Sequence, residues 1–381
     1  MRRMRSRPVL LAGVTILTLA LLGGGWVAFG VSPTPSPTPT PSASSTPATP
    51  TPTPSPSPSP TPSPSPTPTP VARCPLNGLP VDDPALMTRT AIAVQIENHP
   101  GARPARNLSR ADMVIEAPVE GDTTRFTAII LCRATEGLTG PTRSARYYNV
   151  DLWQDLGVLT VGFGASNGAL DRFAAARMPY VNGITGAWPW FRRSGSYAAP
   201  HNLYSDVEAV RTALGSHANL DRLAATVRAL RPPFTFDPEV ELPAGRAVKG
   251  LEIRTNPYWR IGWQWVGALG TWQRLDGGQA ISDAATGERV AATSVVVQRV
   301  AQEIVYGDPD PGGNPRRLQH LVGQGAGTLY AGGRAIDLRW SRPTAADGTR
   351  WTYADGGDAV VLPPGVVWWE IIPTSAGITE S

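Results

Sequence analysis

The segment AIAVQIE, residues 91–97, is a short apolar run ending in a polar residue, which is typical of a buried β-strand. Three similar runs follow it, at Met113–Ala117, Phe126–Cys132 and Gly157–Phe163. Segments with helical periodicity lie at Gly168–Arg177, Asp206–Leu214 and Leu220–Leu230. This mixture of strands and helices predicts an α+β or α/β N-terminal domain over residues 72–232.

The second half of the folded region, residues 233–375, is expected to be a smaller, β-rich C-terminal domain. Its predicted strands lie within Tyr258–Leu269, Ser294–Ala301, Gly327–Arg339, Trp351–Tyr353 and Val366–Ile372. Asp-Gly and Gly-Gly pairs near these runs are typical of tight turns. Most tryptophans lie in this half, either as part of its core or as an aromatic platform for sugar rings.

A basic N-terminus precedes a long apolar segment. Four arginines lie among residues 1–7, and no charged residue occurs from Val9 to Val31. As a helix this segment would be about 35 Å long, enough to cross a hydrocarbon core of about 30 Å. The arginines predict a cytoplasmic tail, a transmembrane helix or signal anchor at residues 8–31, and a folded region outside a cell membrane crossed once. The alternative is a cleaved secretory signal.

The next segment, residues 32–71, is predicted to be a disordered Pro/Thr/Ser-rich stalk. Seventeen of residues 32–70 are proline, which lacks an amide donor and fixes φ. An extended polyproline II chain of this length would span roughly 120 Å. The stalk would therefore carry the folded region into or through a cell wall.

The charge of the chain argues against nucleic-acid binding. The net charge is +4, and the four N-terminal arginines account for all of it, because no other charged residue occurs before Arg73. The remainder of the chain is neutral overall, whereas a nucleic-acid-binding domain is expected to be basic. We therefore expect no nucleic-acid partner.

Two cysteines, Cys74 and Cys132, occur in the chain. In an exported protein an isolated pair indicates a disulfide, which would contribute on the order of 3–4 kcal/mol by closing a loop of about 60 residues. The alternative is two separate thiols, and neither cysteine is interpreted as catalytic. The sequence contains no metal-ligand spacing, hydrolase elbow or phosphate loop, so we expect no metal and no cofactor and assign no catalytic residue.

Four polar segments flank the predicted strands and helices of the first domain: Glu97–Pro100, Gly121–Arg125, Gly140–Arg146 and Ala199–Tyr204. Guanidinium groups match phosphates and carboxylates, so Arg125, Arg143 and Arg146 would form an anion site if they converge. The residues expected to orient the ligand are Asn98, His99, His201 and Asn202. In the alternative interpretation the arginines form structural ion pairs with Glu97, Glu116, Glu120 or Asp151, and the histidines are ordinary loop residues.

Several separated motifs resemble the YerB-like family of bacterial exported proteins. They include CPLNGLPVDDPA from Cys74, GPTRSARYYNVDL from Gly140, APHNLY from Ala199, GQGAGTLYAGGRAIDLRWSR from Gly323 and LPPGVVWWEIIP from Leu362. The resemblance covers most of residues 74–373 and implies export and two domains. Members of that family are commonly lipoproteins, whereas this chain has no cysteine at the end of its apolar run. The resemblance implies no reaction, but the seven candidate site residues fall within its motifs.

Three functions are compatible with these features. The first is a membrane-anchored cell-envelope protein that binds an anionic ligand, such as a cell-wall polymer or its precursor, through the arginine and histidine residues. The second is an enzyme acting on phosphate-bearing wall polymers, which would be favoured if at least two of Asp151, Asp122 and Glu120 converge beside the arginines. The third is a partner-docking protein without a small-molecule site.

Overall fold

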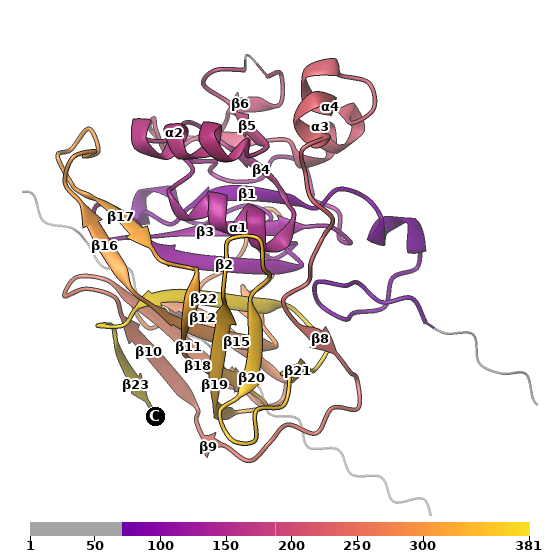
Figure 1. Cartoon of the computed structure of the whole chain (residues 1–381), viewed down its shortest axis with the longest axis vertical. Helices are drawn as coiled ribbons and strands as arrows, with labels where there is room; N and C mark the ends of the chain where they lie inside the picture. Colours follow the sequence, from indigo (N-terminus) through magenta and orange to yellow (C-terminus); the bar gives the residue numbers. More distant parts are fainter. Residues whose placement is uncertain (1–70, 187) are drawn as a thin grey trace, which may run out of the picture. The chain divides into compact units, whose positions relative to one another are not determined.

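The computed structural model describes residues 71–186 and 188–381 (Figure 1). The predicted cytoplasmic tail, the predicted membrane segment and the stalk up to residue 70 lie outside the described residues. Within residues 71–186 and 188–381, no helix combines the length and the apolar character needed to cross a membrane.

The N-terminal half mixes strands with a few helices. Its strands are β1 (Ile92–Glu97), β2 (Met113–Pro118), β3 (Thr124–Ile130), β4 (Leu159–Gly162), β5 (Tyr180–Asn182), β6 (Phe191–Arg193) and β7 (Leu203–Ser205). Its α-helices are α1 (Tyr148–Leu156), α2 (Asn167–Ala176), α3 (Val207–Ala213) and α4 (Ala218–Ala224), and short 3-10 turns occur at Pro84–Met87 (η1) and Pro100–Ala102 (η2).

The C-terminal half is rich in strands, and no helix follows α4 in the described chain. The strands are β8 (Thr235–Phe236), β9 (Arg246–Ala247), β10 (Gly250–Arg254), β11 (Arg260–Val266), β12 (Thr271–Asp276), β13 (Gln279–Ala280), β14 (Ala291–Ala292), β15 (Ser294–Val300), β16 (Gln302–Val305), β17 (Arg316–Gln319), β18 (Gly323–Ala331), β19 (Arg334–Arg342), β20 (Arg350–Tyr353), β21 (Val361–Leu362), β22 (Val367–Pro373) and β23 (Gly377–Glu380). The predicted fold class is therefore confirmed.

One helix is shorter than its pattern suggests. The predicted helix Leu220–Leu230 begins two residues earlier and ends at Ala224. The Thr226 hydroxyl donates a hydrogen bond to the carbonyl of Leu223 at 2.8 Å, a local bond that competes with helix continuation. Pro232 and Pro233 then favour an extended chain.

The largest sheet joins both halves of the chain. Its eleven strands follow the order β20-β19-β18-β15-β22-β2-β3-β1-β4-β5, with β9 paired to β19. Strand β22 lies parallel to β2, so that Trp369 is in register with Ile115, and Figure 1 shows the yellow strand beside the indigo one. The C-terminal half thus completes a sheet that the N-terminal half begins.

Central strands of this sheet are buried on both faces. Every residue of β1, β2, β3 and β22 is buried, which explains their nearly continuous apolar sequences. Leu152 and Leu156 of α1 pack into the core on one face. On the other face lies a second sheet of six strands in the order β13-β12-β11-β10-β23, with β14 paired to β12.

The tryptophans mainly build this core. Trp263, Trp272, Trp368 and Trp369 are at most 1% exposed. Trp263 of the six-stranded sheet packs edge-on against Trp368 of the large sheet, with ring centroids 5.0 Å apart. Burial of these rings explains the high tryptophan content without an aromatic surface platform.

Most central strands of the large sheet end at the same edge. Strands β1, β2, β4, β5, β15 and β22 all run in the same direction, because each is linked by parallel pairs or by two antiparallel steps through β3. Their carboxyl ends therefore lie at one edge of the sheet, here named the carboxyl edge. Strand β3 runs the opposite way and begins there, with Arg125 in register with Glu97.

Candidate functional site

The carboxyl edge brings two of the predicted residues, Arg143 and His201, together around one carboxylate. Glu97, the last residue of β1, is only 4% exposed. Its Oε1 atom lies 3.1 Å from Nε of Arg143, and its Oε2 atom lies 3.1 Å from Nδ1 of His201. Ligands of parallel sheets characteristically bind outside the carboxyl ends of the strands, so the location suits a binding site.

Arg143 keeps free donors in this arrangement. Arg143 lies in the loop between β3 and α1, and its backbone amide donates a hydrogen bond to the carbonyl of Gln95 on β1 at 2.9 Å. Its side chain is 28% exposed, and its contact with Glu97 is an ion pair whose angle is not that of a hydrogen bond. No residue in the described part of the chain accepts a hydrogen bond from its two terminal amino groups.

His99 adds a second imidazole to the site. Its ring stacks on His201, with centroids 4.7 Å apart and planes 10° from parallel. The amide of Gly101 donates to Nδ1 of His99 at 3.0 Å, which fixes the ring at the start of η2. Burial, followed by the nearby charge of His201, lowers the pKa of His99 and so favours its neutral form.

Arg125 lies beneath these exposed groups and has an unusual environment. It is 5% exposed, and its Nη1 donates to the carbonyl of Ser144 at 2.7 Å. Among the described residues it forms no ion pair with a carboxylate, and its buried Nε has no hydrogen-bond partner. Burial, followed by the charge of Arg143, lowers the pKa of Arg125 to about 10.

Arg146 belongs to a neighbouring, internally paired group. It forms a bidentate contact with Glu120, and Arg316 of β17 approaches the same carboxylate at 2.7 Å. Burial, followed by the charge of Arg316, lowers the pKa of Arg146 to about 9. Its Nη1 also donates to the Ser144 carbonyl at 3.0 Å, so the two arginine groups meet at that atom.

The two predicted asparagines do not join the Glu97 group. Asn98 points toward the opposite face of the sheet, where its amide donates to Thr124 at 2.7 Å and its oxygen accepts from Arg103 at 3.0 Å. Asn202 accepts a hydrogen bond from Arg193 at 2.7 Å in the β6–β7 hairpin. Both amides therefore hold loops in place.

Sequence reasoning did not identify all the residues of this region. Glu97 entered only as an ion-pair partner for the arginines, yet it positions both Arg143 and His201. Arg316 was not singled out, because nothing in its local sequence indicates that the β16–β17 hairpin packs against Glu120. The backbone carbonyl of Ser144 carries no side-chain signal at all.

The acidic residues required for a metal-dependent enzyme are engaged separately. Glu120 contacts Arg146 and Arg316, Asp122 pairs with Arg317 at 3.0 Å, and Asp151 pairs with Arg172 at 2.9 Å. These carboxylates are thus distributed over different ion pairs rather than gathered around one position.

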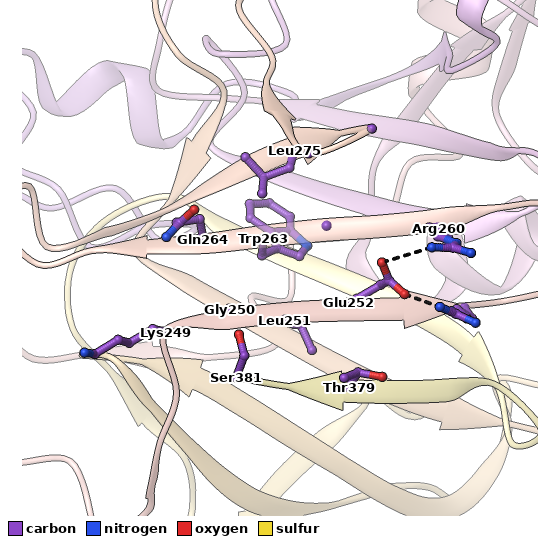
Figure 2. A pocket seen from close by; sticks show the side chains of 14 residues that line it. Lys249, Gly250, Leu251, Glu252, Arg260, Trp263, Gln264, Leu275, Thr379 and Ser381 are labelled. Carbon is purple, nitrogen blue, oxygen red and sulfur yellow. Dashed lines mark hydrogen bonds and ion pairs between the residues drawn. The ribbon is translucent and has the colours of Figure 1, made fainter.

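A large hollow lies elsewhere, on the outer face of the six-stranded sheet. It has a volume of about 700 Å³, and Gly250 and Gly262 are among the residues that line it. Figure 2 shows Gly250 beside Glu252 at this hollow. Glu252 at its side pairs with Arg254 at 2.8 Å and approaches Arg260 at 3.7 Å. None of the seven predicted site residues lines this hollow.

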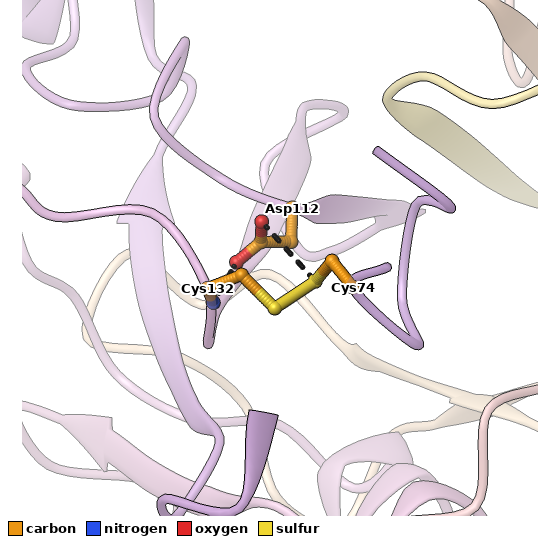
Figure 3. Close-up of side chains that lie close together, drawn as sticks. All are labelled: Cys74, Asp112 and Cys132. Carbon is orange, nitrogen blue, oxygen red and sulfur yellow. Dashed lines mark hydrogen bonds between the residues drawn. A yellow bond between two sulfur atoms is a disulfide. The ribbon is translucent and has the colours of Figure 1, made fainter. Parts of the chain in front are cut away.

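Cys74 and Cys132 form a disulfide, with Cα atoms 6.0 Å apart, beside the buried carboxylate of Asp112 (Figure 3). Asp112 accepts hydrogen bonds from the amides of Leu131 at 2.7 Å and Cys132 at 2.9 Å. These three side chains lie close enough to resemble a metal-ligand cluster. Because both sulfur atoms are already bonded to each other, the group fits a structural crosslink instead.

Known proteins share this sequence and fold. Residues 76–219 match the N-terminal domain, and residues 251–369 the C-terminal domain, of the family described as "Protein of unknown function (DUF3048)". The chain is 28% identical over 303 residues to "Putative lipoprotein YerB" of Bacillus subtilis (strain 168), which covers 79% of this chain and 86% of that protein.

A solved structure agrees with these matches. The crystal structure of YerB protein from Bacillus subtilis superimposes with a TM-score of 0.66 at 26% identity, covering 81% of this chain and 99% of that one. The resemblance inferred from the sequence motifs is thus confirmed. Since the two family matches together span more than half of the chain, the protein belongs to the DUF3048 family.

Proposed function

We propose that this protein is a membrane-associated, extracytoplasmic component of the cell envelope that binds an anionic ligand at the carboxyl edge. Arg143, His99 and His201 contact the ligand, and Arg125 supplies positive charge from beneath. A membrane location is supported by the apolar segment at residues 8–31, which we propose as a single-pass anchor, and by the name of the YerB relative as a lipoprotein.

The environment of Arg125 is the observation that carries this proposal. A buried charge without a counter-charge is costly, so buried arginines are normally paired. Arg143 forms the ion pair with the Glu97 carboxylate, whose charge acts on Arg125 more weakly than the like charge of Arg143, and the side chain of Arg125 donates only to a carbonyl. An anion held by Arg143 would add the negative charge that Glu97 alone does not provide for both arginines.

Two other functions receive less support. The distribution of Glu120, Asp122 and Asp151 over separate ion pairs gives no shared position for a metal-dependent reaction on wall polymers. A protein that only docks partners has no need of free guanidinium donors at this edge, whereas Arg143 keeps two terminal amino groups without an acceptor among the described residues, beside the buried charge of Arg125. An anionic cell-wall polymer or precursor remains the ligand class proposed here.

Isothermal titration calorimetry of the full chain in a mild detergent tests the proposal. Inorganic phosphate, pyrophosphate and teichoic-acid fragments are titrated into the wild type, Arg143→Gln and Arg334→Gln. Arg334 is an exposed arginine at the start of β19, away from the carboxyl edge, and serves as the matched control. We expect Arg143→Gln to weaken binding about tenfold or more, since a charge-assisted hydrogen bond contributes about 1.5–3 kcal/mol. Equal binding by all three proteins, or none by the wild type, would refute the anion site.

A further inference from the structure

We propose that the ligand is an oxyanion that carries a proton, as hydrogen phosphate and phosphomonoesters do, rather than sulfate, a carboxylate or a phosphodiester. The inference rests on the anion site proposed above and specifies its ligand class. It follows from the hydrogen-bonding character of His201 and His99, which differ although their rings are stacked.

His201 presents a hydrogen-bond acceptor. Its Nδ1 lies 3.1 Å from Oε2 of Glu97, and a carboxylate can only accept, so Nδ1 must carry the hydrogen. A neutral imidazole has one hydrogen, which leaves a lone pair on Nε2. Glu97 is almost completely buried and is also held by Arg143, so this orientation of the ring is anchored from two sides.

His99 presents the complementary donor. Its Nδ1 accepts the amide hydrogen of Gly101, so the hydrogen of the neutral ring lies on Nε2. In the part of the chain that the structure describes, no hydrogen bond involves Nε2 of either ring. Because the rings stack 4.7 Å apart, one small ligand can contact both, together with the free amino groups of Arg143.

This combination discriminates between anions of the same charge. Arg143 and His99 donate to any oxyanion, but the lone pair on His201 repels an unprotonated oxygen and attracts a P–OH group. Inorganic phosphate carries at least one such proton at neutral pH, and a phosphomonoester carries one at and below its second pKa of about 6, whereas sulfate and phosphodiesters have none. Sites built to hydrogen-bond a ligand hydroxyl reject analogues that lack it, because the polar group of the protein is left unpaired.

The test compares inorganic phosphate with sulfate at pH 7 and equal ionic strength, by calorimetry on the full chain in detergent. We expect phosphate to bind at least about tenfold more tightly than sulfate, a modest ratio for a site that is partly open to solvent. His201→Phe retains an aromatic ring beside His99 but removes the acceptor, and is expected to bring the phosphate-to-sulfate ratio close to one. His320→Phe is the matched control, since His320 is an exposed histidine 3.7 Å from a different carboxylate, Glu303.

The possible outcomes separate this inference from the anion site itself. Equal binding of phosphate and sulfate by the wild type overturns the inference and leaves the anion site intact, whereas no binding of either anion removes both. A phosphate preference that persists in His201→Phe also overturns the inference, because another group would then select the proton. Should His201→Phe fail to fold, His201→Arg provides the same test, since it replaces the acceptor by donors and its added charge affects both anions alike.

Discussion

Glu116 of β2 and Glu370 of β22 lie in parallel register, and both side chains are completely buried. Arg274 of the six-stranded sheet pairs with Glu116 at 2.8 Å, and Trp368 donates to Glu116 at 3.2 Å. Trp263 donates to Glu370 at 3.0 Å. Burial, followed by the charge of Glu116, raises the pKa of Glu370 well above its usual value, so Glu370 is the carboxyl that holds a proton.

Replacing Glu370 by glutamine should therefore stabilise the protein at neutral and alkaline pH. A carboxyl whose pKa is raised by folding binds more protons in the folded state, so the free energy of unfolding falls as pH rises above the usual pKa of about 4.3. Glutamine has the shape of the protonated acid and does not titrate. Melting curves should show Glu370→Gln above the wild type at pH 8 and equal to it near pH 4. A constant difference at all pH values would contradict the assigned proton.

Glu116→Gln should have the opposite effect, although it is the same substitution one strand away. Arg274 is 3% exposed and loses its paired carboxylate, which leaves an uncompensated buried charge. Breaking such a pair costs on the order of 3–5 kcal/mol. Urea unfolding at pH 7 measures the loss, with Glu370→Gln as the matched control. A change below about 1 kcal/mol would show that Glu370 can replace Glu116 as the partner of Arg274.

The disulfide should contribute measurably to the stability of the folded region. Cys74 and Cys132 are 58 residues apart, and a crosslink over that distance limits the unfolded chain by about 4 kcal/mol. The double variant Cys74→Ser, Cys132→Ser should lower the free energy of unfolding by roughly that amount in urea titrations. Reducing agent should destabilise the wild type similarly and leave the double variant unchanged. A wild type insensitive to reductant, although its thiols become free, would contradict this expectation.

The strands were predictable from sequence, but their partners were not. The apolar runs at Met113–Ala117 and Val366–Ile372 each indicate a buried strand, and each forms one as β2 and β22. A run of buried residues does not specify its neighbour in a sheet. The pairing of β2 with β22 joins segments separated by about 250 residues, so the shared sheet depends on tertiary packing that no local pattern encodes.

The candidate site was partly predictable for a related reason. Polar residues that follow or open strands of one sheet tend to share an edge, and this explains why His99, Arg125 and Arg143 lie in one region. The rule does not specify side-chain direction. Asn98 follows β1 as closely as His99 does, yet its amide is bonded on the opposite face of the sheet. Arg146 is only three residues from Arg143, yet it pairs with Glu120.

Arg125→Met tests whether Arg125 serves anion binding rather than the stability of the ligand-free protein. Methionine fills much of the same buried space and removes a guanidinium that lacks a carboxylate partner, so we expect the melting temperature of the ligand-free protein to be unchanged or higher. The increase that phosphate causes in the wild type by mass action should be lost in the variant. Arg133→Met is the control, because Arg133 also donates to a backbone carbonyl, that of Ser109 at 2.8 Å, but lies at the other end of β3. A large fall in melting temperature without phosphate would mean that Arg125 is structural, and an undiminished response to phosphate would mean that its charge does not serve the site. A binding residue that is buried at an energetic cost should give both results: a variant at least as stable as the wild type without phosphate, and a melting temperature that phosphate no longer raises.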